Sequence, residues 1–328
     1  MKHPHYHLRA NKAADRLILI DTVDRFIGVF DGKRRDYAYY GFGGPFLEDL
    51  KLVRKHFPDM KIVSIEEDPE TYERQKLHRF CKDLELHNAS LDQFLSADYE
   101  PSGKDVFWLD FLKFKPSNLG SVEQLLPNLG LGSIIKITFP AAPPLSPQAL
   151  VNRSKDNRNK FIAREVEKFS SKFSKYLTAG FEKFLYTPND YASLIFQIVK
   201  SSVASVRMSE GLMPALVAVH RYADGIPMVS CTFLIADCNT LPSIKEEIAA
   251  WPLAQFDDAH PQLLELPMLS VQERLRLDCL LPQNNPTGKS LFRRLGYSID
   301  RDEKKSIEML CNYAELQRYY PLFGRLEF

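Results

Sequence analysis

Residues Tyr37–Lys76, YAYYGFGGPFLEDLKLVRKHFPDMKIVSIEEDPETYERQK, carry the strongest signal of the fold in this sequence. The first four residues of this stretch form an aromatic run that suits a buried strand, and the glycine turn Gly41–Pro45 interrupts that run. Apolar residues at helical spacing follow over Phe46–Phe57, and a second strand, Lys61–Ile65, ends at the acid Glu66. A glycine turn between a strand and a helix lets backbone approach a ligand closely. The order of these features predicts a nucleoside-binding, doubly wound α/β sheet.

The acidic phrase Ile65-Glu66-Glu67-Asp68-Pro69 carries the most specific signal. A carboxylate directly after the second strand can accept hydrogen bonds from both ribose hydroxyls of a nucleoside. Together with the glycine turn, the phrase resembles the class I S-adenosylmethionine-dependent methyltransferases over residues 36–236. The resemblance implies a Rossmann-like α/β sheet of about seven strands with a C-terminal antiparallel hairpin. It also implies S-adenosylmethionine as the cofactor.

The resemblance assigns a set of residues to that cofactor. Those expected to bind it are Gly41, Phe42, Gly43, Gly44, Glu66, Glu67, Asn88 and Ala89. The glycines would let backbone approach the methionine end, Glu66 would bind the ribose hydroxyls, and Asn88 would accept from the adenine amino group. A plain turn asparagine is an equally good interpretation of Asn88. One position departs from the family pattern, because Tyr39 replaces the acid that usually stands two residues before the first glycine.

Other interpretations of the same stretch remain open. An NAD-type Rossmann fold fits less well, because Gly41–Gly44 lacks the third spaced glycine. A nucleotide-free α/β sheet with a tight turn is the plainest alternative. The competing functional class is a catalytically degenerate methyltransferase-fold protein that serves as a binding or scaffold partner. Tyr39 in place of an acid and the lack of a complete acceptor motif favour that class.

Asp110 is a candidate catalytic residue, because it ends the predicted fourth strand Lys104–Asp110. Open α/β sheets bind ligands at the carboxyl ends of their strands, where a carboxylate could orient an acceptor amine or hydroxyl. Asp110-Phe111 resembles the Asp-Pro-Phe or Asp-Tyr phrases of some tRNA guanine methyltransferases, but lacks their proline. The alternative is that Asp110 only caps the following loop.

Lys136 is the second candidate catalytic residue and lies inside the predicted fifth strand. Ribose 2′-hydroxyl methyltransferases use a Lys-Asp-Lys-Glu tetrad, and Asp110 and Lys136 resemble two of its members. Lys12 or Arg16 could supply the N-terminal lysine, whereas no glutamate fits clearly because Glu210 precedes the sixth strand. Burying a lysine is costly unless its ammonium has a partner. The pattern therefore favours a solvent-facing Lys136 at a strand end.

The segment 153–183 is the candidate nucleic-acid contact. It carries nine lysines or arginines and four acids, interleaved with Phe161, Phe169, Phe173, Tyr176 and Phe181. Basic and aromatic residues together can bind phosphates and stack on bases, so RNA is the acceptor class that we favour. Phenylalanines at helical spacing more often face the core, however, while lysines keep their charge in water.

The chain divides into an N-terminal helical segment (1–35), a methyltransferase-like domain (36–236) and a helical C-terminal extension (237–328). Pro69–Leu84 is predicted as a helix, and Asp224-Gly225 between two β-rich runs predicts a type I′ hairpin turn. The extension could bind a protein partner through the aromatic residues of its tail. The aromatic residues of the tail are Tyr313, Tyr319, Tyr320, Phe323 and Phe328. The interpretation that we favour is that they close the domain's own core.

Composition narrows the functional classes further. The 328 residues are 45% hydrophobic and 26% charged, which is ordinary for a globular protein, and the net charge of +1 argues against a broadly basic nucleic-acid coat. No apolar run approaches the roughly 20 residues that span a bilayer, so no membrane contact is expected. The segment Met1–His7 lacks the apolar core of a signal peptide. Five scattered cysteines without Cys-x-x-Cys predict reduced thiols in a cytoplasmic protein.

Two motif-like features are set aside. Thr287-Gly288-Lys289-Ser290 imitates the end of a phosphate loop, but Gln283 stands at the position of the required first glycine. His3, His5 and His7 alternate as metal ligands might, but no matching Cys, Asp or Glu spacing accompanies them. Neither an ATP site nor a metal site is expected.

Overall fold

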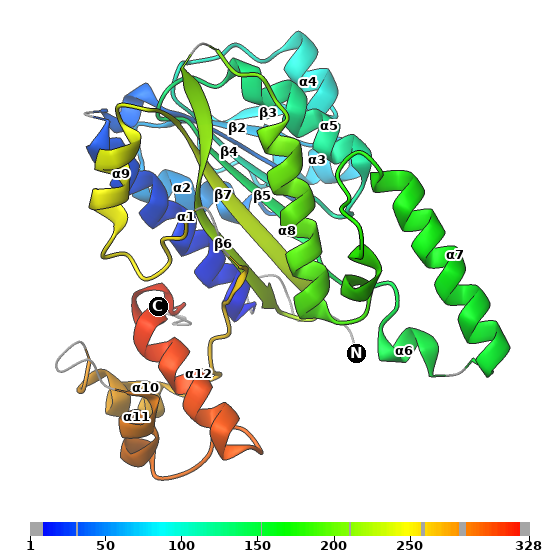
Figure 1. Cartoon of the computed structure of the whole chain (residues 1–328). Coiled ribbons are helices and arrows are strands. Elements are labelled where there is room, and N and C mark those ends of the chain that lie inside the picture. The colour runs from blue at the N-terminus through cyan, green and yellow to red at the C-terminus, as the bar shows by residue number, and fades with distance from the viewer. Residues whose placement is uncertain are drawn as a thin grey trace. The chain divides into compact units, whose positions relative to one another are not determined.

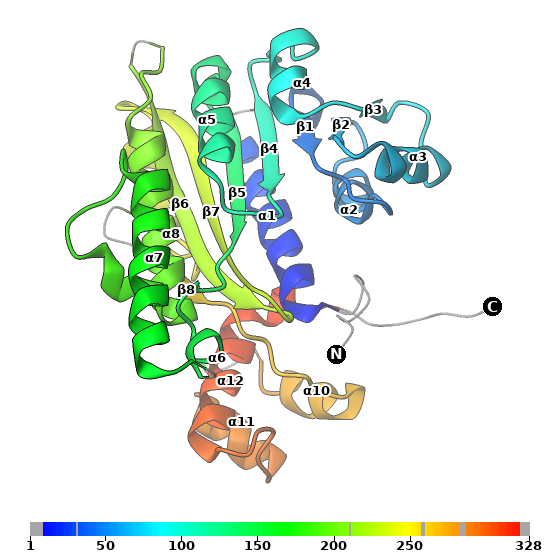
Figure 2. The same ribbon diagram turned by 90° about the vertical axis from the view of Figure 1, so that its right-hand side faces the viewer.

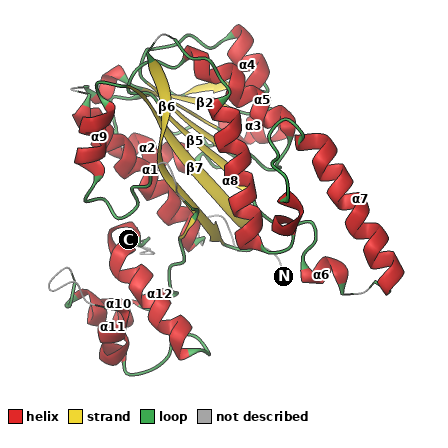
Figure 3. Ribbon diagram, viewed as in Figure 1, coloured by secondary structure: helices red, strands yellow, loops and turns green. Residues whose placement is uncertain are grey.

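The structure, a computed structural model, describes residues 9–30, 32–151, 153–209, 211–256, 260–281 and 287–321. Within these ranges eight strands form one sheet in the order β3-β2-β1-β4-β5-β7-β6-β8 (Figures 1 and 3). The strands are β1 Ala38–Gly41, β2 Lys61–Ile65, β3 Glu85–His87, β4 Asp105–Asp110, β5 Ile134–Pro140, β6 Leu212–Ala223, β7 Pro227–Asp237 and β8 Gln262–Leu263. The α-helices are α1 Ala10–Val29, α2 Glu48–His56, α3 Pro69–Leu77, α4 Leu91–Ala97, α5 Pro116–Leu125, α6 Pro147–Leu150, α7 Lys155–Phe173, α8 Pro188–Ala204, α9 Leu241–Ile248, α10 Val271–Asp278, α11 Gly288–Leu295 and α12 Glu303–Leu316. Short 3₁₀ turns are η2 Arg34–Asp36, η3 Leu126–Asn128, η4 Phe181–Leu185 and η5 Gln317–Tyr319.

The sheet is parallel from β3 to β5, and β7 then runs antiparallel to β5. The register sets Gly41, the last residue of β1, beside Ser64 on β2 and Trp108 on β4. Asp110 ends β4 beside Thr138 of β5. The predicted Rossmann-like methyltransferase sheet is confirmed, and the structure adds the two-residue strand β8 to the seven strands expected.

Helices cover both faces of the sheet. In Figures 1 and 2, α4, α5 and α8 lie on one face, while α2 and the second half of α1 lie on the other. The face under α5 and α8 is apolar, and it holds the main hydrophobic cluster, in which Tyr40 stacks on Phe107 at 4.5 Å between ring centroids. Burial of this continuous apolar face supplies most of the free energy that stabilises the sheet.

The hairpin between β6 and β7 forms as expected, but its turn differs from the prediction. Three residues, 224–226, connect the strands, and of these only Gly225 has a positive φ, at 115°. A type I′ turn needs positive φ at both central residues, so that prediction is wrong. Asp224 instead accepts hydrogen bonds from the backbone N–H groups of Asn11 (3.2 Å) and Lys12 (2.7 Å) at the start of α1.

The described chain forms two compact units. One contains the described parts of Met1–Leu19, Tyr222–Gly225 and Leu263–Phe328, and the other contains Ile20–Arg221 and Ile226–Gln262. Within the first unit, Asn11 Oδ1 accepts from the backbone N–H of Leu266 at 2.9 Å. The division into 1–35, 36–236 and 237–328 stays a prediction.

The tail aromatic residues that are described belong to a core. Tyr313, Tyr319 and Tyr320 are buried, and the Tyr320 hydroxyl donates to the Pro267 carbonyl at 2.8 Å. All five cysteines are free. Across the described ranges, no helix has both the length and the apolar character needed to cross a bilayer. The residues His3, His5, His7, Glu210, Gln283, Phe323 and Phe328 lie outside the described residues.

Glu123 of α5 fixes the neighbouring helices, and we expect Glu123→Gln to lower the free energy of unfolding by about 1–3 kcal/mol. Its carboxylate accepts from Lys175 Nζ (2.9 Å), the Tyr176 hydroxyl (2.7 Å) and the Ser202 hydroxyl (2.8 Å). Burial raises the pKa of Glu123, but these hydrogen bonds outweigh burial and lower the pKa overall.

The stabilisation from Glu123 should therefore be present near neutral pH and disappear as the pH falls through the lowered pKa. Urea unfolding at several pH values measures it, with the exposed Glu182→Gln as the matched control. Equal stability of Glu123→Gln and wild type at pH 7 would show that the cluster contributes nothing.

Candidate active site

The glycine turn after β1 is a crowded backbone loop. A Cβ on Gly43 would lie 2.6 Å from Leu47 Cδ2 and 2.8 Å from Ser64 Oγ, so no larger residue fits there without a shift. Gly44 has φ of +54° and would meet no atom within 4 Å, so its outer side is open. Leu47 closes the turn with φ of 57°, which is rare for leucine, and its N–H donates to the Gly43 carbonyl at 3.0 Å. The turn is thus packed against Leu47 and Ser64 at Gly43 and open at Gly44, as a backbone site that binds a ligand requires.

Two aromatic residues flank the turn. Tyr39, which replaces the expected acid, is buried, and its hydroxyl lies 2.9 Å from where a Gly41 Cβ would stand. The phenol therefore packs beneath the turn. Phe42 packs edge-on against Phe111 at 5.5 Å between ring centroids, which joins the glycine turn to the loop after β4.

Glu66 follows β2 at the same edge of the sheet. Its N–H donates to the His87 carbonyl at 3.0 Å, and its Oε1 accepts from the Asp68 N–H at 3.0 Å. Partial burial raises the pKa of the Glu66 carboxyl, and the nearby charges of Asp68 and Glu67 raise it further. Glu67 itself is exposed, and Asp68 caps α3 by accepting from Thr71 N–H at 2.8 Å.

Asn88 follows β3 and is held against the end of β2. Its Nδ2 donates to the Glu66 carbonyl at 2.8 Å, while the side chain remains exposed. No hydrogen bond to its Oδ1 occurs among the described residues, so this oxygen is available to accept from a ligand amine. Ala89 packs partly buried against the hydrophobic cluster.

Asp110 is placed at the carboxyl end of β4, as predicted, and is partly exposed. Beneath it, Trp108 Nε1 donates to Thr138 Oγ1 at 3.1 Å, and Thr138 Oγ1 lies 2.9 Å from Ser230 Oγ. These buried hydrogen bonds fix the neighbouring strands below the carboxylate. Loops at this edge thus bring the glycine turn, Glu66, Asn88 and Asp110 to the same side of the sheet.

Lys136 is fully buried, so the expectation of a solvent-facing side chain is wrong. It lies opposite Trp108 on β4 and Thr232 on β7, with its Nζ 5.0 Å from the Trp108 ring centroid. The ring face offers a cation a favourable partner, which helps offset the cost of burial. Because side chains alternate along a strand, Lys136 and Asp110 share one face of the sheet, with Lys136 deeper beneath it. Of the residues suggested for the first tetrad position, Lys12 and Arg16 are both buried on α1.

Gln75 is a residue that the sequence patterns missed. It is fully buried on α3, while Leu77 on the same helix is 81% exposed. Its Nε2 donates to the Gly44 carbonyl at 3.0 Å, and its Oε1 accepts from Ser64 Oγ at 2.9 Å. In the sequence, the only feature that could have indicated burial of Gln75 was its place in a helix with no clear apolar face.

The aromatic residues of 153–183 mostly face inward. Phe169, Phe173 and Phe181 are buried, and Phe161 and Tyr176 are partly buried. Arg153 covers the Phe161 ring at 3.8 Å from the ring centroid. Base stacking by the three buried rings would therefore require their release from the core.

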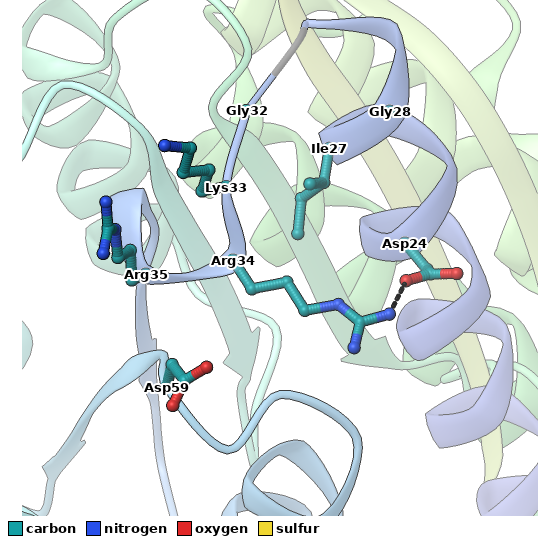
Figure 4. Close-up of a pocket in the computed structure, with 8 residues that line it drawn as sticks. All are labelled: Asp24, Ile27, Gly28, Gly32, Lys33, Arg34, Arg35 and Asp59. Atoms are coloured by element: carbon teal, nitrogen blue, oxygen red, sulfur yellow. Dashed lines mark hydrogen bonds and ion pairs between the residues drawn. The ribbon is translucent and has the colours of Figure 1, made fainter.

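A hollow of about 610 Å³ lies near the amino ends of β1 and β2, at the opposite edge of the sheet. It is lined by Asp24, Ile27, Gly28, Gly32, Lys33, Arg34, Arg35 and Asp59 (Figure 4). An ion pair of 2.8 Å between Arg34 and Asp24 crosses it. Its lining carries two acids and three bases, and parallel α/β sheets bind ligands at the other edge, so we assign it no role in the site.

The parallel sheet with one antiparallel strand, the glycine turn and the acid after β2 are the features that the resemblance to the class I S-adenosylmethionine-dependent methyltransferases implies. The sequence match agrees: residues 4–328 match the model of the family described as "Putative O-methyltransferase", and the chain belongs to that family. Among curated proteins, nothing matches this chain.

Solved structures resemble the chain at a distance. The complex of LepI with SAM is 12% identical to this chain, with a TM-score of 0.33, and the match covers 60% of this chain and 42% of the LepI chain. Cofactor-bound Rv0187 from MTB is 10% identical, with a TM-score of 0.37, and the match covers 72% of this chain and 84% of Rv0187. The "putative O-methyltransferase" from Klebsiella pneumoniae is 11% identical with a TM-score of 0.40, covering 71% and 83%. The chain thus spans less than half of LepI, and likenesses of this extent say nothing about its acceptor.

Proposed function

We propose that this protein transfers the methyl group of S-adenosylmethionine to a hydroxyl oxygen of its acceptor. The observation that carries the proposal is the gathering of an open glycine turn, Glu66, Asn88 and Asp110 at one edge of a parallel sheet. The family description supports oxygen as the acceptor atom.

The described residues fit this cofactor. The open side of Gly44 would leave room for the methionine end beside backbone, and the Glu66 carboxylate would accept from two ribose hydroxyls. Asn88 Oδ1 faces no hydrogen-bond donor among the described residues and can accept from the adenine amino group. When bound, the cofactor supplies an activated methyl group on sulfonium. Catalysis by the chain itself is then mainly alignment of the acceptor.

Asp110 would provide that alignment. Its carboxylate can accept the hydrogen bond of an acceptor hydroxyl, hold the oxygen in line and take up its proton as the bond forms. Lys136, which lies deeper on the same face of the sheet, would add positive potential beneath the acceptor.

RNA is the acceptor class that the sequence favours, and it is one of the acceptors to be tested. The exposed basic residues of α7 support it, whereas the buried phenylalanines of α7 favour a core role. The alternative class, a degenerate methyltransferase-fold scaffold that binds a protein through its C-terminal extension, is supported by Tyr39 in place of an acid.

A methyl-transfer assay tests the proposal. The purified protein is incubated with isotope-labelled S-adenosylmethionine and separate panels of small hydroxylated compounds, total RNA and proteins, and products are identified by mass spectrometry. We expect label on oxygen of an acceptor, lost in Asp110→Ala. Label on nitrogen or carbon would contradict the assigned atom, and cofactor binding without transfer in every panel would favour the scaffold class.

A further inference from the structure

The amide of Gln75 makes two hydrogen bonds of opposite polarity. Its Nε2 donates to the Gly44 carbonyl at 3.0 Å, and its Oε1 accepts from the Ser64 hydroxyl at 2.9 Å. Both Gln75 and Ser64 are 0% exposed. Without access to solvent, an unpaired partner cannot recover a hydrogen bond from water, so each bond constrains its partner strongly.

These bonds connect the two halves of the cofactor edge. Gly44 belongs to the glycine turn, while Ser64 lies in β2, two residues before Glu66. The Ser64 hydroxyl is also close beneath Gly43, 2.8 Å from where its Cβ would stand. One side-chain amide from α3 therefore bridges the glycine turn and the strand that carries Glu66.

The glycine turn also needs such support. Gly44 has φ of +54°, and a Cβ built on it would meet no atom within 4 Å, so no side chain packs over that position. The hydrogen bond from Gln75 fixes the direction of the Gly44 carbonyl. A fixed carbonyl in turn fixes the peptide plane that a ligand would approach.

We propose that Gln75 is a positioning residue, which fixes the glycine turn for the methionine end of the cofactor without touching the cofactor. The inference rests on the proposed function. It predicts a selective effect: ligands that carry the amino-acid end depend on Gln75. 5′-Methylthioadenosine lacks that end but keeps the adenine and ribose, so its binding should depend on Glu66 and Asn88 and not on Gln75.

Calorimetric titration of the full-length protein with S-adenosylhomocysteine and with 5′-methylthioadenosine tests this. Gln75→Leu removes both hydrogen bonds of the amide. The affinity for S-adenosylhomocysteine should fall about tenfold, the effect of roughly one lost buried hydrogen bond, whereas the affinity for 5′-methylthioadenosine should stay within about twofold of wild type. In Gln75→Glu, an ionised carboxylate would oppose the Gly44 carbonyl. Relative to the wild type at the same pH, affinity for S-adenosylhomocysteine should therefore be weak near neutral pH and recover as the pH falls and the carboxyl becomes a donor.

The exposed Gln124→Leu and Gln124→Glu are matched controls and should bind both ligands as the wild type does. If Gln75→Leu does not fold, as judged by thermal melting, Ser64→Ala removes the hydrogen bond at the other end of the Gln75 amide and tests the same bridge indirectly, with an expected loss of about threefold in affinity for S-adenosylhomocysteine. Equal loss of both ligands would show a merely structural role, and unchanged binding would also overturn the inference while the proposed function stands. Failure of the wild type to bind either ligand would overturn both.

Discussion

Replacing Glu66 by alanine should raise the dissociation constant for S-adenosylmethionine by about 100-fold or more. Two ribose hydroxyls would each lose a hydrogen bond to a charged acceptor, and such bonds contribute about 1.5–3 kcal/mol each. The raised pKa of Glu66 adds a pH signature. Because the ionised form is the better acceptor, affinity should rise as the pH increases through that pKa, and Glu66→Gln should lack this dependence.

The exposed neighbour Glu70→Ala is the matched control and should bind as the wild type does. Stability separates a binding defect from a folding defect. Burial disfavours the charged form of Glu66, so above its unfolded pKa this carboxyl destabilises the free protein. Glu66→Gln should therefore melt at the same temperature as wild type or higher. A variant that binds normally would remove Glu66 from the site.

Replacing Asp110 by alanine should reduce kcat on the order of 10²–10⁴-fold and leave the affinity for S-adenosylmethionine unchanged within about twofold. The reason is its place at the end of β4, beyond the buried Trp108–Thr138 hydrogen bond that fixes the strand beneath it. Steady-state kinetics with the identified acceptor, together with calorimetry, separate these two quantities.

Asp110→Asn keeps the size of the side chain and removes its ability to take up a proton, so it should retain cofactor binding with similarly low kcat. The exposed Asp156→Ala on α7 is the matched control. If Asp110→Ala turned over at the wild-type rate, the carboxylate would have only a capping role in the following loop.

Most strands of the sheet could be predicted from local signals in the sequence, whereas the two-residue strand β8 was not expected. Lys61–Ile65 was predicted with the bounds that the structure gives, since the acidic phrase after it stops the strand. The helix predicted over Pro69–Leu84 ends instead at Leu77. Just after this end, the Arg79 guanidinium donates to the Cys81 and Leu84 carbonyls at 3.1 and 2.8 Å. Such side-chain-to-backbone bonds leave no trace in hydrophobic periodicity.

The positions of the candidate site residues followed from topology alone, because the carboxyl ends of parallel strands meet at one edge. What the sequence did not reveal was burial of polar side chains. Lys136 is buried beside the Trp108 ring, and Gln75 is buried while Leu77 on the same helix is exposed. Both arrangements depend on partners distant in sequence, and periodicity assigns burial by residue type rather than by partner.

A crystal structure of the protein with S-adenosylhomocysteine would show directly whether the cofactor binds at the glycine turn and Glu66. We expect the nucleoside at the carboxyl ends of β1 and β2, with both ribose hydroxyls within hydrogen-bonding distance of the Glu66 carboxylate and the amino-acid end against the glycine turn. Density for the ligand elsewhere, for instance in the hollow beside Arg34, with the glycine turn empty, would contradict it.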